Sequence, residues 1–155
     1  SFILENYTEE SAKHYFDTAP IDSWEGIWLL TENGERVAIE RFKDIRFSEI
    51  FTHRIVKLDS SVRSEIPVGT ILGYLTRGVN PNTCFIWLYK HKLTGAILYA
   101  PKRFSARLTS DLNGILFSGN SAKKLEDLFD PRSGFIKLYP KQIPEDSENR
   151  EIRYL

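Results

Sequence analysis

Short segments that alternate between apolar and polar residues recur along most of this chain, with turn-forming residues between them. The clearest pair, 24–31 and 36–42, flanks Asn33-Gly34. That dipeptide is typical of a tight hairpin, because both central residues of a type I′ turn need positive φ. Pro101 is expected to end one segment, since proline cannot donate to a hydrogen-bond ladder. The remaining segments, spaced as in a sandwich or barrel, are 51–58, 70–77, 84–90, 96–100, 103–109 and 115–119.

The two faces of these segments indicate how they assemble. Successive residues of a strand point to opposite faces, so Phe104, Ala106 and Leu108 share one face of segment 103–109. An apolar face on every segment requires one enclosed interior, and a barrel provides it without exposed edges. The sequence therefore predicts an all-β fold, an eight-stranded antiparallel up-and-down barrel with its strands between residues 24 and 119.

Helical periodicity appears on either side of the predicted strands. Residues 8–17 begin at Thr8, a good N-cap, and residues 121–130 carry Leu125, Leu128 and Phe129 on one face. A short ninth strand over 134–140 and a charged tail over 141–155 follow. No shift in composition marks a boundary, so we expect a single domain over 1–155.

Composition excludes several classes of protein. The 155 residues are 41% hydrophobic and 13% aromatic, which is enough to build a core without metals or disulfides. Lys+Arg and Asp+Glu both number 21, so no surplus of basic charge favours a nucleic acid as the main partner. No apolar run approaches the ~20 residues of a membrane-spanning helix. The single Cys84 lies within an apolar segment and is expected to be a buried, inert thiol.

The layout of the segments resembles that of the lipocalins and, more broadly, the calycin barrels. The residues that carry the resemblance are Gly26 and Trp28, a Gly-x-Trp on the first predicted strand after a short helix. In that family the tryptophan packs against a basic residue near the last strand and closes one end of the barrel. The resemblance implies this role for Gly26 and Trp28, with Arg107, Lys137 or Arg132 as the basic partner.

Three differences from that family are visible. A tight Asn33-Gly34 turn stands where lipocalins have a large loop over the cavity mouth. The family's Thr-Asp-Tyr signature is missing, and one cysteine cannot form its disulfide.

The first hypothesis for function is a non-catalytic barrel that binds a small apolar or amphipathic molecule. Such a site would be concave and lined mainly by apolar and aromatic groups. The aromatic residues expected to line it are Trp28, Trp87, Tyr89, Tyr99, Phe104 and Phe117. Trp28 has a structural interpretation as well, as part of the barrel closure. The alternative is a filled barrel that acts as a structural or protein-interaction module of a larger bacterial protein.

Catalysis is not expected, and neither is a cofactor or a metal. His14, His53 and His91 show no metal-ligand spacing, and no nucleophile-elbow motif is present. An enzyme on this barrel would need titratable groups converging in the cavity. The residues to inspect for that are Glu40, Arg41, His53 and Arg107. The chain starts at Ser1 and contains no Met, which fits a mature or a trimmed form. The compartment is not predicted, and a mature form would favour a secreted or periplasmic protein.

Overall fold

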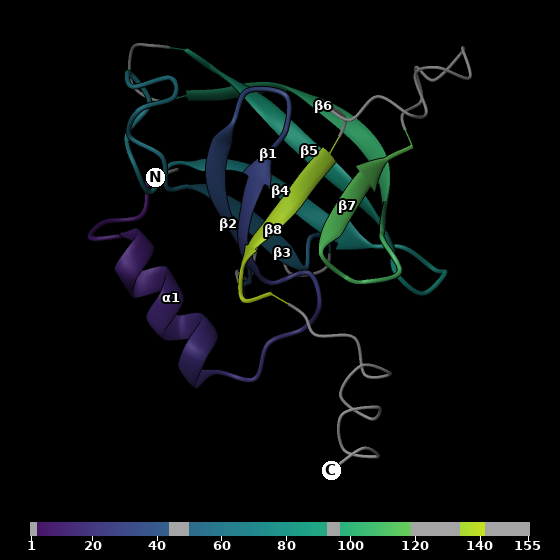
Figure 1. Ribbon diagram of the computed structural model, residues 1–155. Coiled ribbons are helices and arrows are strands. Elements are labelled where there is room, and N and C mark those ends of the chain that lie inside the picture. Colours follow the sequence, from purple (N-terminus) through teal and green to yellow (C-terminus); the bar gives the residue numbers. More distant parts are fainter. Residues whose placement is uncertain (1–2, 44–49, 93–96, 119–133, 142–155) are drawn as a thin grey trace.

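The computed structural model describes residues 3–43, 50–92, 97–118 and 134–141, which form one helix beside a closed antiparallel barrel (Figure 1). The strands follow one another around the barrel in chain order, and β1 pairs with β8 to close it. The predicted eight-stranded up-and-down barrel is therefore confirmed. The strands are β1 Gly26–Leu30, β2 Glu35–Arg41, β3 His53–Lys57, β4 Ile71–Arg77, β5 Thr83–Lys92, β6 Ile97–Leu108, β7 Gly114–Phe117 and β8 Gly134–Tyr139.

The first hairpin forms where the sequence places it, but its turn is of another kind. Leu30 pairs with Glu35, so four residues connect β1 and β2 instead of two. Gly34 has φ +74°, whereas Asn33 does not have positive φ. The Asn33 side chain instead accepts a hydrogen bond from the Glu35 amide at 3.0 Å. The dipeptide was thus a correct signal for a hairpin and a wrong one for a type I′ turn.

Strand β6 joins two segments that the sequence separates at Pro101. Ala100 has φ +47°, and the register of β5 against β6 shifts between Leu88 and Lys90. A bulge of this kind leaves one residue out of the ladder, and it is one of the few places where a sheet tolerates proline. The prediction that Pro101 ends a strand was wrong because the bulge absorbs it.

Strand β8 was predicted as a ninth strand and is the eighth strand of the barrel. It lies between β7 and β1, with Ile115 opposite Phe135 and Trp28 opposite Lys137. The barrel still has eight strands, because the predicted segments 96–100 and 103–109 merge into β6. The predicted helix 121–130 and nearly all of the tail 141–155 lie outside the described residues.

Helix α1, Glu9–Thr18, packs on the outside of the barrel (Figure 1). Thr8 caps it through a reciprocal capping box with Ser11, which satisfies two amides that the helix itself leaves unpaired. Its buried residues Ala12 and Phe16 form a cluster with Ala38 and other apolar side chains of β1–β3. The helix thus covers a part of the barrel wall, and no described helix is long and apolar enough to cross a membrane.

Candidate functional site

The barrel has one end that the chain itself covers. At this closed end, where β1 begins and β8 ends, the segment before β1 crosses the barrel and buries Trp24 in the core. The Trp28 indole is fully buried and donates a hydrogen bond to the Trp24 carbonyl at 2.9 Å. Lys137 from β8 places its Nζ 4.5 Å from the centroid of the Trp28 ring, a cation–π contact.

Gly26 is required by this arrangement. It has φ +150°, and a Cβ there would lie 2.6 Å from Lys137 Cε and in contact with the Tyr139 carbonyl. Only glycine therefore lets the lysine side chain pass across β1 to the indole.

Among the three basic residues considered as the partner of Trp28, Lys137 occupies the position. Arg107 is exposed on the outer face of β6, and Arg132 lies outside the described residues. Lys137 is buried, and this burial lowers its pKa to about 8, partly offset by the carboxylates of Asp22 and Glu25.

A charged network surrounds the closed end. His53 Nε2 lies 2.9 Å from Asp22 Oδ2, and Arg77 donates to the same oxygen at 2.8 Å. The fully buried Glu25 accepts from Arg41 Nε at 3.0 Å and from the Tyr15 hydroxyl at 2.5 Å. These bonds fasten the crossing segment to helix α1 and to β2, β3 and β4.

Asp22, Glu25 and His53 bring their donor atoms within 4.8 Å of one another, a grouping that could hold a metal ion. However, Arg41 Nε lies 3.0 Å from Glu25 Oε1 and 3.7 Å from Asp22 Oδ2. A guanidinium between the carboxylates already supplies the positive charge that a cation would bring. The grouping therefore behaves as an ion-pair network.

The residues considered for catalysis do not converge in a cavity. Arg41 and His53 belong to the network just described, and Glu40 bonds Tyr7 and Arg54 on the outer side of the barrel. Cys84 is buried in the barrel core, and this burial raises its pKa to about 12, which keeps the thiol protonated and unreactive.

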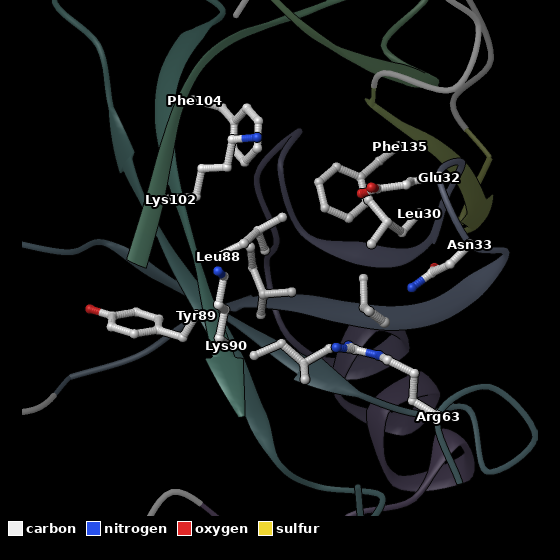
Figure 2. A pocket seen from close by; sticks show the side chains of 13 residues that line it. Leu30, Glu32, Asn33, Arg63, Leu88, Tyr89, Lys90, Lys102, Phe104 and Phe135 are labelled. Atoms are coloured by element: carbon white, nitrogen blue, oxygen red, sulfur yellow. The ribbon is translucent and has the colours of Figure 1, made fainter. Parts of the chain in front are cut away.

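The opposite, open end of the barrel contains a cavity of about 270 Å³ (Figure 2). Its floor consists of apolar side chains from several strands, and its mouth is bordered by the β1–β2 turn, the β3–β4 loop and strands β5 and β6. The lining residues are Leu30, Glu32, Asn33, Val37, Ile55, Arg63, Leu72, Leu88, Tyr89, Lys90, Lys102, Phe104 and Phe135. The interior toward the closed end is filled, with Trp28, Ile39, Leu75 and Ile86 all fully buried.

The β3–β4 loop is held against this end by buried charges. Glu35 Oε2 lies 2.5 Å from Lys57 Nζ, and Glu35 Oε1 lies 2.5 Å from Arg63 Nη2. Lys57 also donates to the carbonyl of Val62, and Ile66 of the loop is buried in the barrel core. The loop therefore forms one fixed wall of the mouth.

Cations on the β5–β6 side of the mouth have no counterion within the part of the chain that the structure describes. Lys90 and Lys102 are exposed, and neither forms an ion pair with a described residue. In contrast, Arg36, Arg41, Arg54, Lys57 and Arg77 on β2–β4 each contact a carboxylate. Figure 2 shows Lys90 and Lys102 on one wall of the cavity, opposite Glu32 and Asn33.

The structure separates the six aromatic residues expected to line a ligand site. Phe104 lines the cavity, and Phe117 stacks on it at 4.6 Å between ring centroids. Trp28 lies at the closed end. Trp87 packs in an aromatic layer outside the barrel, and Tyr89, although its residue borders the cavity, directs its ring away (Figure 2). Tyr99 belongs to β6, opposite Lys90.

The cations at the mouth were not predicted from the sequence. A detectable signal was present, because residues 66–110 contain no aspartate or glutamate. The net charge of zero concealed this signal, because it sums over the whole chain and does not show a segment that carries only positive charge.

A second hollow, of about 450 Å³ and more open to solvent, runs along β7 and β8 beside the exposed Leu116 and Ile136. It also borders Gly134, the first residue of β8.

No protein-family model matches the chain, and no significant match was found among curated proteins or solved structures. The closed eight-stranded antiparallel barrel is compatible with a calycin-like fold. Within that fold, the contact between Trp28 and Lys137 agrees with the closure that the resemblance to lipocalins implies.

Proposed function

We propose that this protein is a non-catalytic, lipocalin-like barrel that binds a small amphipathic molecule at its open end. The observation that carries the proposal is the cavity of about 270 Å³, with an apolar floor and charged groups confined to its mouth. Small-molecule sites are typically concave and apolar, with a few polar groups that fix orientation.

The size of the cavity limits the ligand to a compact molecule. Ligand sites usually begin at about 300 Å³, and this cavity lies just below that figure. Its volume corresponds to about nine water molecules at about 30 Å³ each. A molecule with roughly that number of buried heavy atoms fits, whereas a long-chain lipid would leave most of its length outside.

Titration with naphthamide, a neutral molecule with a compact apolar body, tests the proposal. We expect saturable chemical-shift changes in the NMR spectrum that concentrate on Leu30, Leu88, Phe104 and Phe135. The variant Leu88→Trp fills the cavity and should abolish them, whereas Leu138→Trp enlarges an exposed side chain of β8 and should not. Changes scattered over the surface without saturation would refute the proposal.

The alternative function is a filled barrel that acts as a protein-interaction module. The observation in its favour is the aromatic layer outside the barrel, where Phe51 stacks on Tyr74 at 4.5 Å and Trp87 is only half-buried. Tryptophan and tyrosine are enriched at interface hot spots. Under this alternative, Trp87→Ala abolishes binding of a partner while naphthamide never binds.

A further inference from the structure

We infer that the ligand of the open-end cavity is an organic anion, a compact acid whose charged group lies between Arg63, Lys90 and Lys102. This inference rests on the proposed function and names the chemical class of the ligand.

The charges around the cavity are strongly unequal. Among the described residues that line it, three side chains are cationic and only Glu32 is acidic. Lys90 and Lys102 come from the two neighbouring strands β5 and β6, which contain no acidic residue. A group that bound inside the mouth would therefore meet positive potential from one whole wall, and an anion would gain from it.

Arg63 adds an unused hydrogen-bond donor. One side of its guanidinium is bound to Glu35, but its buried Nε has no hydrogen-bond partner among the described residues. A buried donor without an acceptor is costly, and such groups are rare in native structures. Figure 2 shows this guanidinium among the side chains directed into the cavity, and a small shift of the side chain would bring the enclosed Nε within reach of an acceptor atom of a ligand.

Arg63 is also held in an uncommon backbone conformation. Its φ is +48°, a region that non-glycine residues seldom adopt and that persists only when surrounding contacts enforce it. The bond to Glu35 at 2.5 Å and the buried Ile66 supply those contacts. The guanidinium is thus held beside the cavity before any ligand arrives, which lowers the entropic cost of binding.

The apolar part of the cavity favours a ligand whose acid group is attached to a flat aromatic ring or a short aliphatic chain. Phe104 and Phe135 line it, and Phe117 packs against both rings at 4.6 and 5.5 Å between centroids. Lys102 Nζ lies 5.3 Å from the Phe104 centroid, so a cation and an aromatic wall are adjacent. An aromatic or short aliphatic carboxylate matches both groups at once.

Naphthoate and naphthamide test the inference, because they share size and shape and differ in charge. We expect naphthoate to bind about tenfold more tightly at low ionic strength, since exposed ion pairs each contribute modestly. Lys90→Gln and Lys102→Gln should each weaken naphthoate binding about threefold without changing that of naphthamide. The matched control Arg107→Gln removes one exposed charge from the outer face of β6 and should leave both affinities unchanged.

The outcomes separate this inference from the proposed function. If naphthamide binds in the cavity as tightly as naphthoate, the inference is wrong while the proposed function stands. If neither compound binds, both fail. Loss of the naphthoate preference at high salt in the wild type would agree with the inference, because mobile ions screen exposed charges. A preference unaffected by both lysine substitutions would overturn it.

Discussion

Lys137 reaches across β1 and holds its Nζ 4.5 Å from the centre of the Trp28 ring, in space that a side chain at Gly26 would occupy. Three residues from the two ends of the chain thus form one unit at the closed end of the barrel. The ammonium group is fully buried there and also lies 3.4 Å from the Ser23 carbonyl. Its charge is therefore compensated by a ring, a carbonyl and the carboxylates of Asp22 and Glu25 instead of by water.

The buried ammonium predicts a stability that rises with pH in the alkaline range. The folded pKa of Lys137 is about 8, below the unfolded value of 10.5, so the unfolded chain binds more protons between these values. The free energy of unfolding should then increase by about 2 kcal/mol between pH 7 and pH 9.5. Urea denaturation at several pH values measures this, and Lys137→Met should remove the increase. Parallel pH curves for the wild type and the variant would contradict the prediction.

Gly26→Ala should destabilise the barrel far more than Gly34→Ala. Both glycines have positive φ, but a Cβ at Gly34 meets no atom within 4 Å, whereas one at Gly26 collides with Lys137 and the Tyr139 carbonyl. We expect a loss of about 1 kcal/mol for Gly34→Ala, from backbone strain alone. Gly26→Ala should cost about 3 kcal/mol or more, since displacement of β8 adds to the strain. Equal losses in thermal denaturation would show that the close approach of Lys137 is unimportant.

Alternation of apolar and polar residues was sufficient to predict the barrel, because alternation reflects local strand geometry. The role of Gly26 and Trp28 was implied by the resemblance to lipocalins and not by local geometry in the sequence. The sequence could not identify Lys137 among three basic residues, since that choice depends on how β8 lies against β1. Pro101 was misinterpreted because the bulge opposite it depends on the register of β5. The sequence predicted that an apolar cavity exists but not where it lies in the barrel. Its location depends on which aromatic rings turn inward, and Trp87 and Phe104 turn to opposite sides.

Asp22 should make the closed end sensitive to acid. Burial by itself would raise its pKa, but hydrogen bonds and charge from His53 and Arg77 outweigh this, and the pKa is lowered. The unfolded chain therefore takes up a proton first as the pH falls below about 4, and stability is lost from there downward. Asp22→Asn should cost about 2 kcal/mol at neutral pH, since it weakens bonds to charged groups. It should also flatten the acid limb of the stability curve, and an unchanged acid limb would count against this role.

The pair of Glu35 and Lys57 offers the last prediction, because both side chains are fully buried and lie 2.5 Å apart. Glu35→Gln leaves a buried ammonium without its counterion and should destabilise the protein by about 3–5 kcal/mol. It also releases Arg63, so the β3–β4 loop should lose protection from hydrogen exchange. The double variant Glu35→Leu with Lys57→Met removes both charges and should recover most of the stability.

Glu9→Gln is the matched control for this pair, since it breaks an ion pair with Arg36 in which both side chains are about one-third or more exposed. Its cost should stay below about 1 kcal/mol in the same urea denaturation. If Glu35→Gln costs no more than Glu9→Gln, the buried pair does not hold the loop. The fixed wall of the mouth would then need another explanation, because Glu35 is the only carboxylate that contacts Arg63 among the described residues.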